Sequence, residues 1–143
     1  MSKHHIEVVL VFITNNPKNV KSPILLVTTP IDGKPYLPSV ALREQESTIE
    51  AAARLLKSLT GVPAKLHGSG WAELVPLPLS DAVSRKIGDD RWIAVPYACR
   101  EPLTGDIPTP LGYEFCRLAT VLEQQDLGMD HNDILAAALQ RLI

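Results

Sequence analysis

The chain has 143 residues, of which 45% are hydrophobic and 21% are charged, and its formal net charge is -2. These values are typical of one compact domain with a core of its own, and they exclude a whole-protein attraction to nucleic acid or to an anionic membrane. No apolar run approaches the roughly 20 residues of a membrane span, and the short N-terminal run lacks a cleavage site. We therefore predict a single cytoplasmic domain over residues 1–143 with no membrane partner.

Two strands are predicted at the start of the chain. Residues 6–14 are rich in β-branched side chains, which indicates a central strand. Residues 24–28 are predicted to pair with it as a hairpin, because residues 15–19 are typical turn formers. A second turn at residues 32–35 then leads into the middle of the chain.

A strand, a loop and an amphipathic helix are predicted between residues 37 and 62. Ser47 or Thr48 could cap the helix start, and Ser47 with Glu50 three residues later is typical of a capping box. Gly61 is expected to end the helix, because glycine readily adopts the left-handed conformation of a C-terminal cap. The apolar residues that recur at helical spacing are Ile49, Ala52, Ala53 and Leu56.

The next part of the chain contains shorter elements. We predict short strands over residues 64–67 and 71–75, a helical turn over residues 80–86 and a longer strand over residues 91–99. Pro96 interrupts this last strand. Because proline cannot donate a backbone hydrogen bond, we expect the strand to lie at a sheet edge or to contain a bulge.

The C-terminal part begins with a proline-rich loop over residues 101–110. It is followed by a predicted strand over residues 113–118 and a short helix over residues 119–126. The last predicted helix lies within residues 127–142.

The two cysteines, Cys99 and Cys116, each fall inside a predicted strand. The chain has no C-x-x-C pattern, which argues against a metal or redox role. We expect buried reduced thiols in a reducing compartment, and the alternative of a disulfide stays open if the two strands are neighbours.

Glu46, Arg54 and Gly61 stand in the pattern E-x7-R-x6-G. The stretch resembles the Nudix box, G-x5-E-x7-R-E-U-x-E-E-x-G-U with U aliphatic, which fits residues 40–62 without a gap. Leu37 and the proline after it also match a Leu-Pro pair that usually precedes the box. The resemblance implies a Nudix-like α/β/α sandwich, in which a mixed β-sheet lies between helices.

Val40 replaces the first glycine of this pattern, and the other departures fall on its metal-binding acids. Family members cleave a diphosphate linked to another group and use Mg²⁺ held largely by helix glutamates, because this hard cation prefers oxygen ligands. Leu55, Ser58 and Leu59 stand where those glutamates are expected, on one face of the helix. Only Glu46 remains of the box glutamates. The resemblance therefore implies a degenerate box without a metal site, and we expect no cofactor.

The C-terminal segment, residues 127–142, resembles the closing helix of the ADP-ribose-type Nudix branch. In that branch Asp-His is followed by Ile-Leu and then by Ala-Leu-x-Arg-Leu, as here from Asp130 and His131 onward. We expect Asp130 to cap the helix and His131 to pack it down, rather than to form a catalytic dyad. The branch includes transcriptional repressors that bind ADP-ribose-like effectors. No DNA-binding motif accompanies this domain, so nucleic acid is not an expected partner.

The first function hypothesis is that the protein binds a nucleotide-derived, ADP-ribose-like small molecule with little or no hydrolysis. The basic side chains that could meet its phosphates are Arg43, Arg54, Lys57 and Arg91. The aromatic side chains that could stack on its base are Trp71, Trp92 and Tyr97. Arg54 could instead pair with Glu46, and the aromatic residues could be core or sheet-face residues.

Two alternatives stay open. An active diphosphate hydrolase would need Mg²⁺ held by relocated ligands, for which the available acids are Glu44, Glu46, Glu50, Asp89, Asp90, Glu101 and Asp106. A protein-interaction module would use an exposed face formed by Leu55 and Leu59, and its partner could be a second copy of the chain. Neighbouring loops could also cover that face and bury it.

Overall fold

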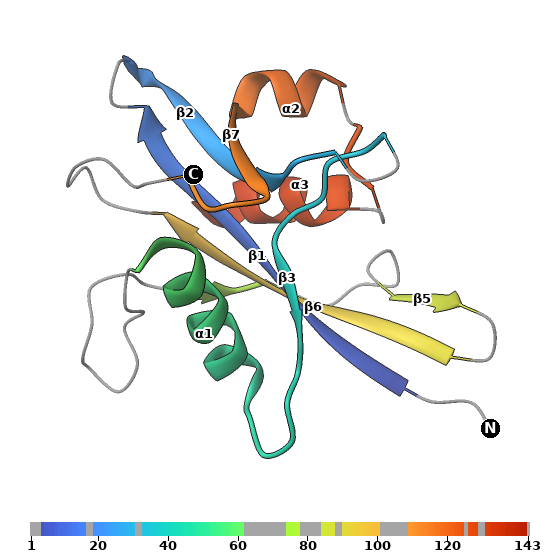
Figure 1. Cartoon of the computed structure of the whole chain (residues 1–143). Helices are drawn as coiled ribbons and strands as arrows, with labels where there is room; N and C mark the ends of the chain where they lie inside the picture. The colour runs from blue at the N-terminus through green and yellow to red at the C-terminus, as the bar shows by residue number, and fades with distance from the viewer. Residues whose placement is uncertain are drawn as a thin grey trace.

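The structure is a computed structural model of the chain, and it describes residues 4–16, 19–30, 33–61, 74–77, 84–87, 90–100, 109–124, 126–128 and 131–142. Among these residues seven strands form one mixed sheet, with helices on both of its faces (Figure 1). The strands are β1 (His4–Asn16), β2 (Asn19–Thr28), β3 (Ser39–Ala41), β4 (Leu74–Pro76), β5 (Ser84–Ile87), β6 (Asp90–Arg100) and β7 (Tyr113–Arg117). The helices are α1 (Thr48–Thr60), α2 (Leu118–Gln124) and α3 (His131–Leu142). The predicted α/β/α sandwich is confirmed.

The sheet is organised around β1 and β6, which run parallel from the pair His4↔Arg91 to the pair Ile13↔Arg100. β2 pairs antiparallel with the C-terminal part of β1, and β3 pairs antiparallel with residues 7–9 on the same edge. β4 and β5 share the outer edge of β6 in the same way, while β7 extends the sheet beyond β2. The predicted central strand and its hairpin are therefore confirmed.

The two faces of β1 fill two separate apolar clusters. Its odd-numbered residues from 9 to 13 pack with α2 and α3, and its even-numbered residues from 8 to 12 pack with α1 (Figure 1). This is the two-residue period of a strand, and burial on both faces explains the continuous apolar run in the sequence. The cluster beneath α1, named here the α1-side cluster, consists of Val8, Leu10, Phe12, Leu26, Ala51, Ala52, Leu55, Leu56, Leu74, Tyr97 and Cys99.

Pro96 lies in β6, inside the sheet, so the predicted edge position or bulge is wrong. The register with β1 runs unbroken through the pair Val9↔Pro96. The Pro96 carbonyl points toward the β4 edge, where it accepts a hydrogen bond from the Leu77 amide at 3.0 Å. The missing N–H would point the same way, because the N–H and C=O of a strand residue share one edge. Pro96 thus falls between residues 90–93, which pair with β5, and residues 97–99, which pair with β4.

The helical turn predicted over residues 80–86 is also wrong for its described part. Residues 84–86 belong to β5, which pairs antiparallel with the start of β6. A four-residue segment has little helical preference of its own, so pairing with a neighbouring strand decides its conformation. Residues 64–67 and 71–73 lie outside the described residues, and the rest of that second predicted strand is in β4. β7 and α2 follow the predictions for residues 113–126 closely.

The two cysteines are far apart in the sheet. Cys99 on β6 and Cys116 on β7 are separated by β1 and β2, which amounts to three strand spacings of about 4.8 Å each. Cys99 also belongs to the α1-side cluster, whereas Cys116 packs against the cluster on the other face. Neither cysteine forms a disulfide, and Cys99 is buried as predicted, whereas Cys116 is only half-buried. Of the helices in the described ranges, none is long and apolar enough to cross a membrane.

Candidate functional site

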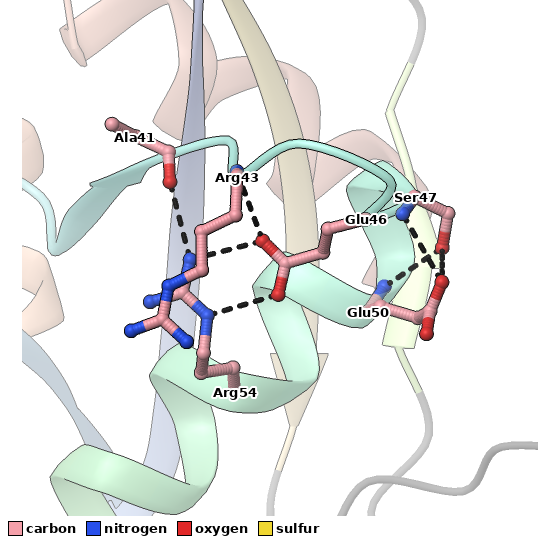
Figure 2. A network of polar contacts seen from close by, with 6 residues as sticks. All are labelled: Ala41, Arg43, Glu46, Ser47, Glu50 and Arg54. Carbon is pink, nitrogen blue, oxygen red and sulfur yellow. Dashed lines mark hydrogen bonds and ion pairs between the residues drawn. The ribbon is translucent and has the colours of Figure 1, made fainter.

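The helix that carries the candidate site, α1, has the predicted capping box at its start (Figure 2). The Glu50 amide donates to Ser47 Oγ at 3.3 Å, and the Ser47 amide donates to Glu50 Oε1 at 3.1 Å. Gly61 ends the helix with φ at 76°, and its N–H donates to the Lys57 carbonyl at 2.8 Å. Both ends of the helix are therefore fixed by local residues that the sequence pattern identifies.

An ion pair between Glu46 and Arg54 lies at the centre of the candidate site (Figure 2). Arg54 Nε donates to Glu46 Oε2 at 2.9 Å, and Arg54 Nη2 donates to Glu46 Oε1 at 3.0 Å, which makes the contact bidentate. Arg54 Nη2 also donates to the Ala41 carbonyl at 3.1 Å, and the Arg43 amide donates to Glu46 Oε1 at 3.2 Å. These contacts tie the end of β3 and the following loop to the middle of α1.

The ion pair also sets the charge of its members. The hydrogen bond from Arg54 is the main cause of a lowered pKa at Glu46, and the Arg43 amide acts in the same direction. Glu46 in turn raises the pKa of Arg54. Glu46 is therefore an ionised carboxylate whose two oxygens already accept hydrogen bonds from the protein. The alternative in which Arg54 pairs with Glu46, instead of facing a phosphate alone, is confirmed.

The three metal-binding positions that depart from the box pattern lie in different surroundings. Leu55 is only 7% exposed and belongs to the α1-side cluster. Leu59 is half-buried and packs against the same cluster, whereas Ser58 is exposed. The hypothesis of an interaction module predicts that Leu55 is exposed. This prediction is wrong, because the Leu55 side chain is buried in the core of the protein.

The remaining ligand candidates are spread over a loop, a helix and a strand. Arg43 is exposed in the loop before α1, and Lys57 is exposed one turn after Arg54. Arg91 and Trp92 are near the start of β6, where their backbones pair with β1, but their side chains lie outside the described part of the structure. The structure thus brings Arg43 and Arg54 together through Glu46.

Tyr97 does not offer its ring to a ligand. It is 7% exposed, lies in the α1-side cluster, and its hydroxyl is 2.7 Å from Thr48 Oγ1 at the start of α1. The interpretation of Tyr97 as a core residue is therefore confirmed. Trp71 lies outside the described residues.

The acids considered for a relocated metal site do not gather in the described structure. Glu46 and Glu50 are occupied by the ion pair and the capping box, and Glu44 is exposed in the loop before the helix. The side chains that fall outside the described residues are those of Asp89, Asp90, Glu101 and Asp106. Within the described ranges, no group of three or more His, Cys, Asp or Glu residues is placed to hold a metal ion.

A contact between Leu37 and α3 is absent from the sequence-based predictions. His131 is 2% exposed, and its Nδ1 accepts a hydrogen bond from the Leu37 amide at 2.9 Å. The prediction that His131 packs the helix down is confirmed, while Asp130 lies outside the described residues. The sequence contains a Leu-Pro pair before the box and a distant Asp-His pair, but no local pattern shows that these two segments lie in contact.

A scan against protein-family models finds no match, and a search of curated proteins finds none either. Solved structures do match. The Nudix domain of Shewanella oneidensis NrtR, complexed with ADP ribose, is 20% identical with a TM-score of 0.66, and the match covers 100% of this chain and 91% of that one. NrtR complexed with a 27mer DNA is 17% identical with a TM-score of 0.68 over 96% of this chain, which spans only 61% of that longer chain.

The MutT protein from Methanosarcina mazei Go1 is also similar, with 18% identity and a TM-score of 0.63 over 98% of this chain and 96% of that one. At these identities the likeness establishes the fold and nothing finer. The same sheet, with helices on both faces, was implied by the resemblance of residues 40–62 to the Nudix box. The protein therefore has the Nudix fold.

Proposed function

We propose that this Nudix-fold protein binds a nucleoside-diphosphate-linked small molecule of the ADP-ribose type and hydrolyses it little or not at all. The observation that carries the proposal is the burial of Leu55, which is 7% exposed within the α1-side cluster. This position and its two partners on the helix face, Ser58 and Leu59, would hold the acids of a catalytic box. Here the three side chains offer one hydroxyl and no carboxylate.

Those residues of the box stretch that the structure describes do not fit the Mg²⁺ site of a diphosphate hydrolase. Mg²⁺ needs oxygen ligands in nearly octahedral geometry and is usually bound through carboxylates, waters and substrate phosphate. Glu46 is the box glutamate that remains, and both of its oxygens accept hydrogen bonds from Arg54 or Arg43. Moving Glu46 onto a metal would leave the Arg54 guanidinium without its bidentate partner.

Binding of an anionic ligand is supported by the charges around α1. Arg43 and Lys57 are exposed cations, in the loop before α1 and one turn after Arg54, and the Arg43 side chain extends beside the Glu46–Arg54 pair in Figure 2. Arginine suits phosphate groups because its planar guanidinium can donate two parallel hydrogen bonds. The similar Nudix domain solved in complex with ADP ribose makes this compound the first ligand to test.

The test combines a binding and a turnover measurement on one sample. The protein is incubated with ADP-ribose, NADH, diadenosine polyphosphates or nucleoside triphosphates, each with Mg²⁺, with Mn²⁺ or with a chelator. We expect ADP-ribose to raise the melting temperature equally with metal and with chelator, because a ligand that binds only the folded state stabilises it. Chromatography of the same samples should detect no metal-dependent products. Turnover at ordinary enzyme rates, or no stabilisation by any compound, would overturn the proposal.

A matched pair of variants locates the binding. Arg43→Gln removes an exposed cation beside the Glu46–Arg54 pair, whereas Lys34→Gln removes an exposed cation outside the candidate site. We expect Arg43→Gln to weaken ADP-ribose binding about tenfold or more, because one charge-assisted phosphate contact is lost. The affinity of Lys34→Gln should remain within about twofold of the unmodified protein. Equal effects of the two changes would place the ligand elsewhere.

A further inference from the structure

The segment that leads into the box stretch is held against the start of α3 by several contacts. The Leu37 amide donates to His131 Nδ1 at 2.9 Å, and the Gly128 amide donates to the Pro35 carbonyl at 2.9 Å. Between these two hydrogen bonds the Tyr36 ring meets the His131 ring edge-on, with centroids 6.0 Å apart and planes at 84°. Residues 35–37 are therefore fixed to a part of the chain more than ninety positions away.

The hydrogen bond between Leu37 and His131 is buried on both sides. Leu37 is 0% exposed and His131 is 2% exposed, so water cannot replace either partner. A buried backbone N–H without an acceptor is costly, and this requirement assigns the ring state: Nδ1 accepts and therefore carries no proton. A side chain without an acceptor at this position would leave the Leu37 amide unpaired in the core.

Gly128 shows how closely the two segments approach. A Cβ atom added at this glycine would lie 2.2 Å from a carbon of the Tyr36 ring, well inside van der Waals contact. The Tyr36 backbone is fixed by two hydrogen bonds with Thr28: its amide donates to Thr28 Oγ1 at 3.0 Å, and its carbonyl accepts from the Thr28 amide at 2.8 Å. A side chain at position 128 would therefore have to displace the Tyr36 ring. The contact therefore depends on glycine at position 128.

From Leu37 the chain leads directly to the candidate site. The Pro38 carbonyl accepts from the Leu10 amide at 2.9 Å, and β3 then pairs with β1 over three residues. The last residue of β3, Ala41, accepts from Arg54 Nη2 at 3.1 Å. The hydrogen bond at Leu37 thus fixes one end of a short strand whose other end contacts the Glu46–Arg54 pair.

We propose that His131 is a positioning residue for the candidate site: by holding the Leu37 peptide, it sets the placement of β3 and of the loop that carries Arg43 and Glu46. The effect of His131 on ligand affinity rests on the proposed function. The effect of His131 on the order of residues 36–42 does not depend on the proposed function. The two effects can therefore be tested separately.

Hydrogen exchange, followed by mass spectrometry, measures the order of this segment without a ligand. In His131→Leu the peptide covering residues 36–42 should exchange about tenfold faster relative to a peptide from β1, because the lost hydrogen bond opens the segment locally. His131→Asn, whose Oδ1 can accept in place of Nδ1, should restore most of this protection. Leu135→Ala is the matched control, because it creates a cavity in the same helix without touching the Leu37 amide.

The control separates positioning from general destabilisation. Leu135→Ala should speed exchange of the two peptides by the same factor, because it lowers the stability of the whole domain. If His131→Leu also speeds both peptides equally, His131 is only a core residue and the proposal is overturned. Should His131→Leu fail to fold, the unmodified protein still decides: the Leu37 amide must exchange together with the α3 amides, and independent exchange of the two would equally overturn it.

Ligand affinity supplies the readout that a purely structural role would not change. At a temperature where all variants are folded, ADP-ribose should bind His131→Leu about tenfold more weakly than the unmodified protein, but bind Leu135→Ala with unchanged affinity. Equal affinities of His131→Leu and Leu135→Ala would refute the coupling to the site. If the unmodified protein binds no ADP-ribose, the proposed function fails, whereas the exchange result still decides whether His131 orders residues 36–42.

Discussion

The polar and the apolar region of α1 differ sharply in their surroundings, although Arg54 of the first and Leu55 of the second are adjacent in the sequence. Arg54 keeps 25% of its side chain exposed and joins the polar network with Glu46 and Ala41, whereas Leu55 is 7% exposed and packs into the α1-side cluster. The two side chains leave the helix about 100° apart, which is enough to place one at the surface and the other in the core. One ion pair can hold a loop to a helix by itself, but a Mg²⁺ site requires carboxylate oxygens that are open to the cation.

The largest expected effect comes from placing an acid in the apolar region. Leu55→Glu buries a carboxylate in the α1-side cluster, and we expect the free energy of unfolding to fall by on the order of 3 kcal/mol or more. Ser58→Glu adds the same group at an exposed position of the same helix and should change stability by about 0.5 kcal/mol at most. Urea denaturation of both variants measures this difference.

Equal urea midpoints for Leu55→Glu and Ser58→Glu would contradict the difference between the two regions. That result would mean that position 55 opens to water at little cost. A carboxylate there could then face a metal ion, as in the box pattern. We expect instead a clear separation, with Leu55→Glu near the limit of stable folding.

A smaller effect, with a distinct pH dependence, is expected in the polar region. The Arg54 hydrogen bond lowers the pKa of Glu46 in the folded protein, so the ion pair contributes stability above the carboxyl's unfolded pKa and loses it as the pH falls through the folded value. Glu46→Gln should therefore be less stable than the unmodified protein at neutral pH. The difference should shrink below about pH 4. Urea midpoints across the acid range measure it, and a difference that grows on acidification would contradict the assignment.

The smallest of the three effects tests the start of the helix, which serves both regions. Ser47→Ala removes the hydroxyl that accepts from the Glu50 amide, and loss of such a cap typically costs about 1 kcal/mol. Thermal denaturation measures this loss of stability. The control is Thr60→Ala at the other end of α1, which removes a hydroxyl but leaves the N-cap unchanged. A loss at Ser47 no larger than that at Thr60 would show that packing alone fixes the helix start.

The elements that follow from local chemistry could be predicted from the sequence. Ser47, Glu50 and Gly61 define α1 through contacts within a few residues, so the pattern alone places its ends. The apolar run of β1 likewise indicates a central strand because both of its faces are buried. The pairing of Arg54 with Glu46 was foreseen as an alternative because the box spacing brings the two together.

The features that depend on distant pairing could not be predicted. Pro96 suggests an edge strand, and only the division of the β6 edge between β4 and β5 explains why it fits inside the sheet. The burial of Leu55 depends on how α1 packs on strands from four parts of the chain, which helical spacing does not contain. The bond from Leu37 to His131 joins two segments with no pattern in common.

A titration with Mn²⁺ tests the central claim most directly, because electron paramagnetic resonance reports free Mn²⁺ without requiring any substrate. We predict no saturable one-to-one site in the unmodified protein, and the same result in Glu46→Gln. Stoichiometric Mn²⁺ binding that is lost in Glu46→Gln would contradict the account, because it would show a working metal site at the box despite Leu55, Ser58 and Leu59.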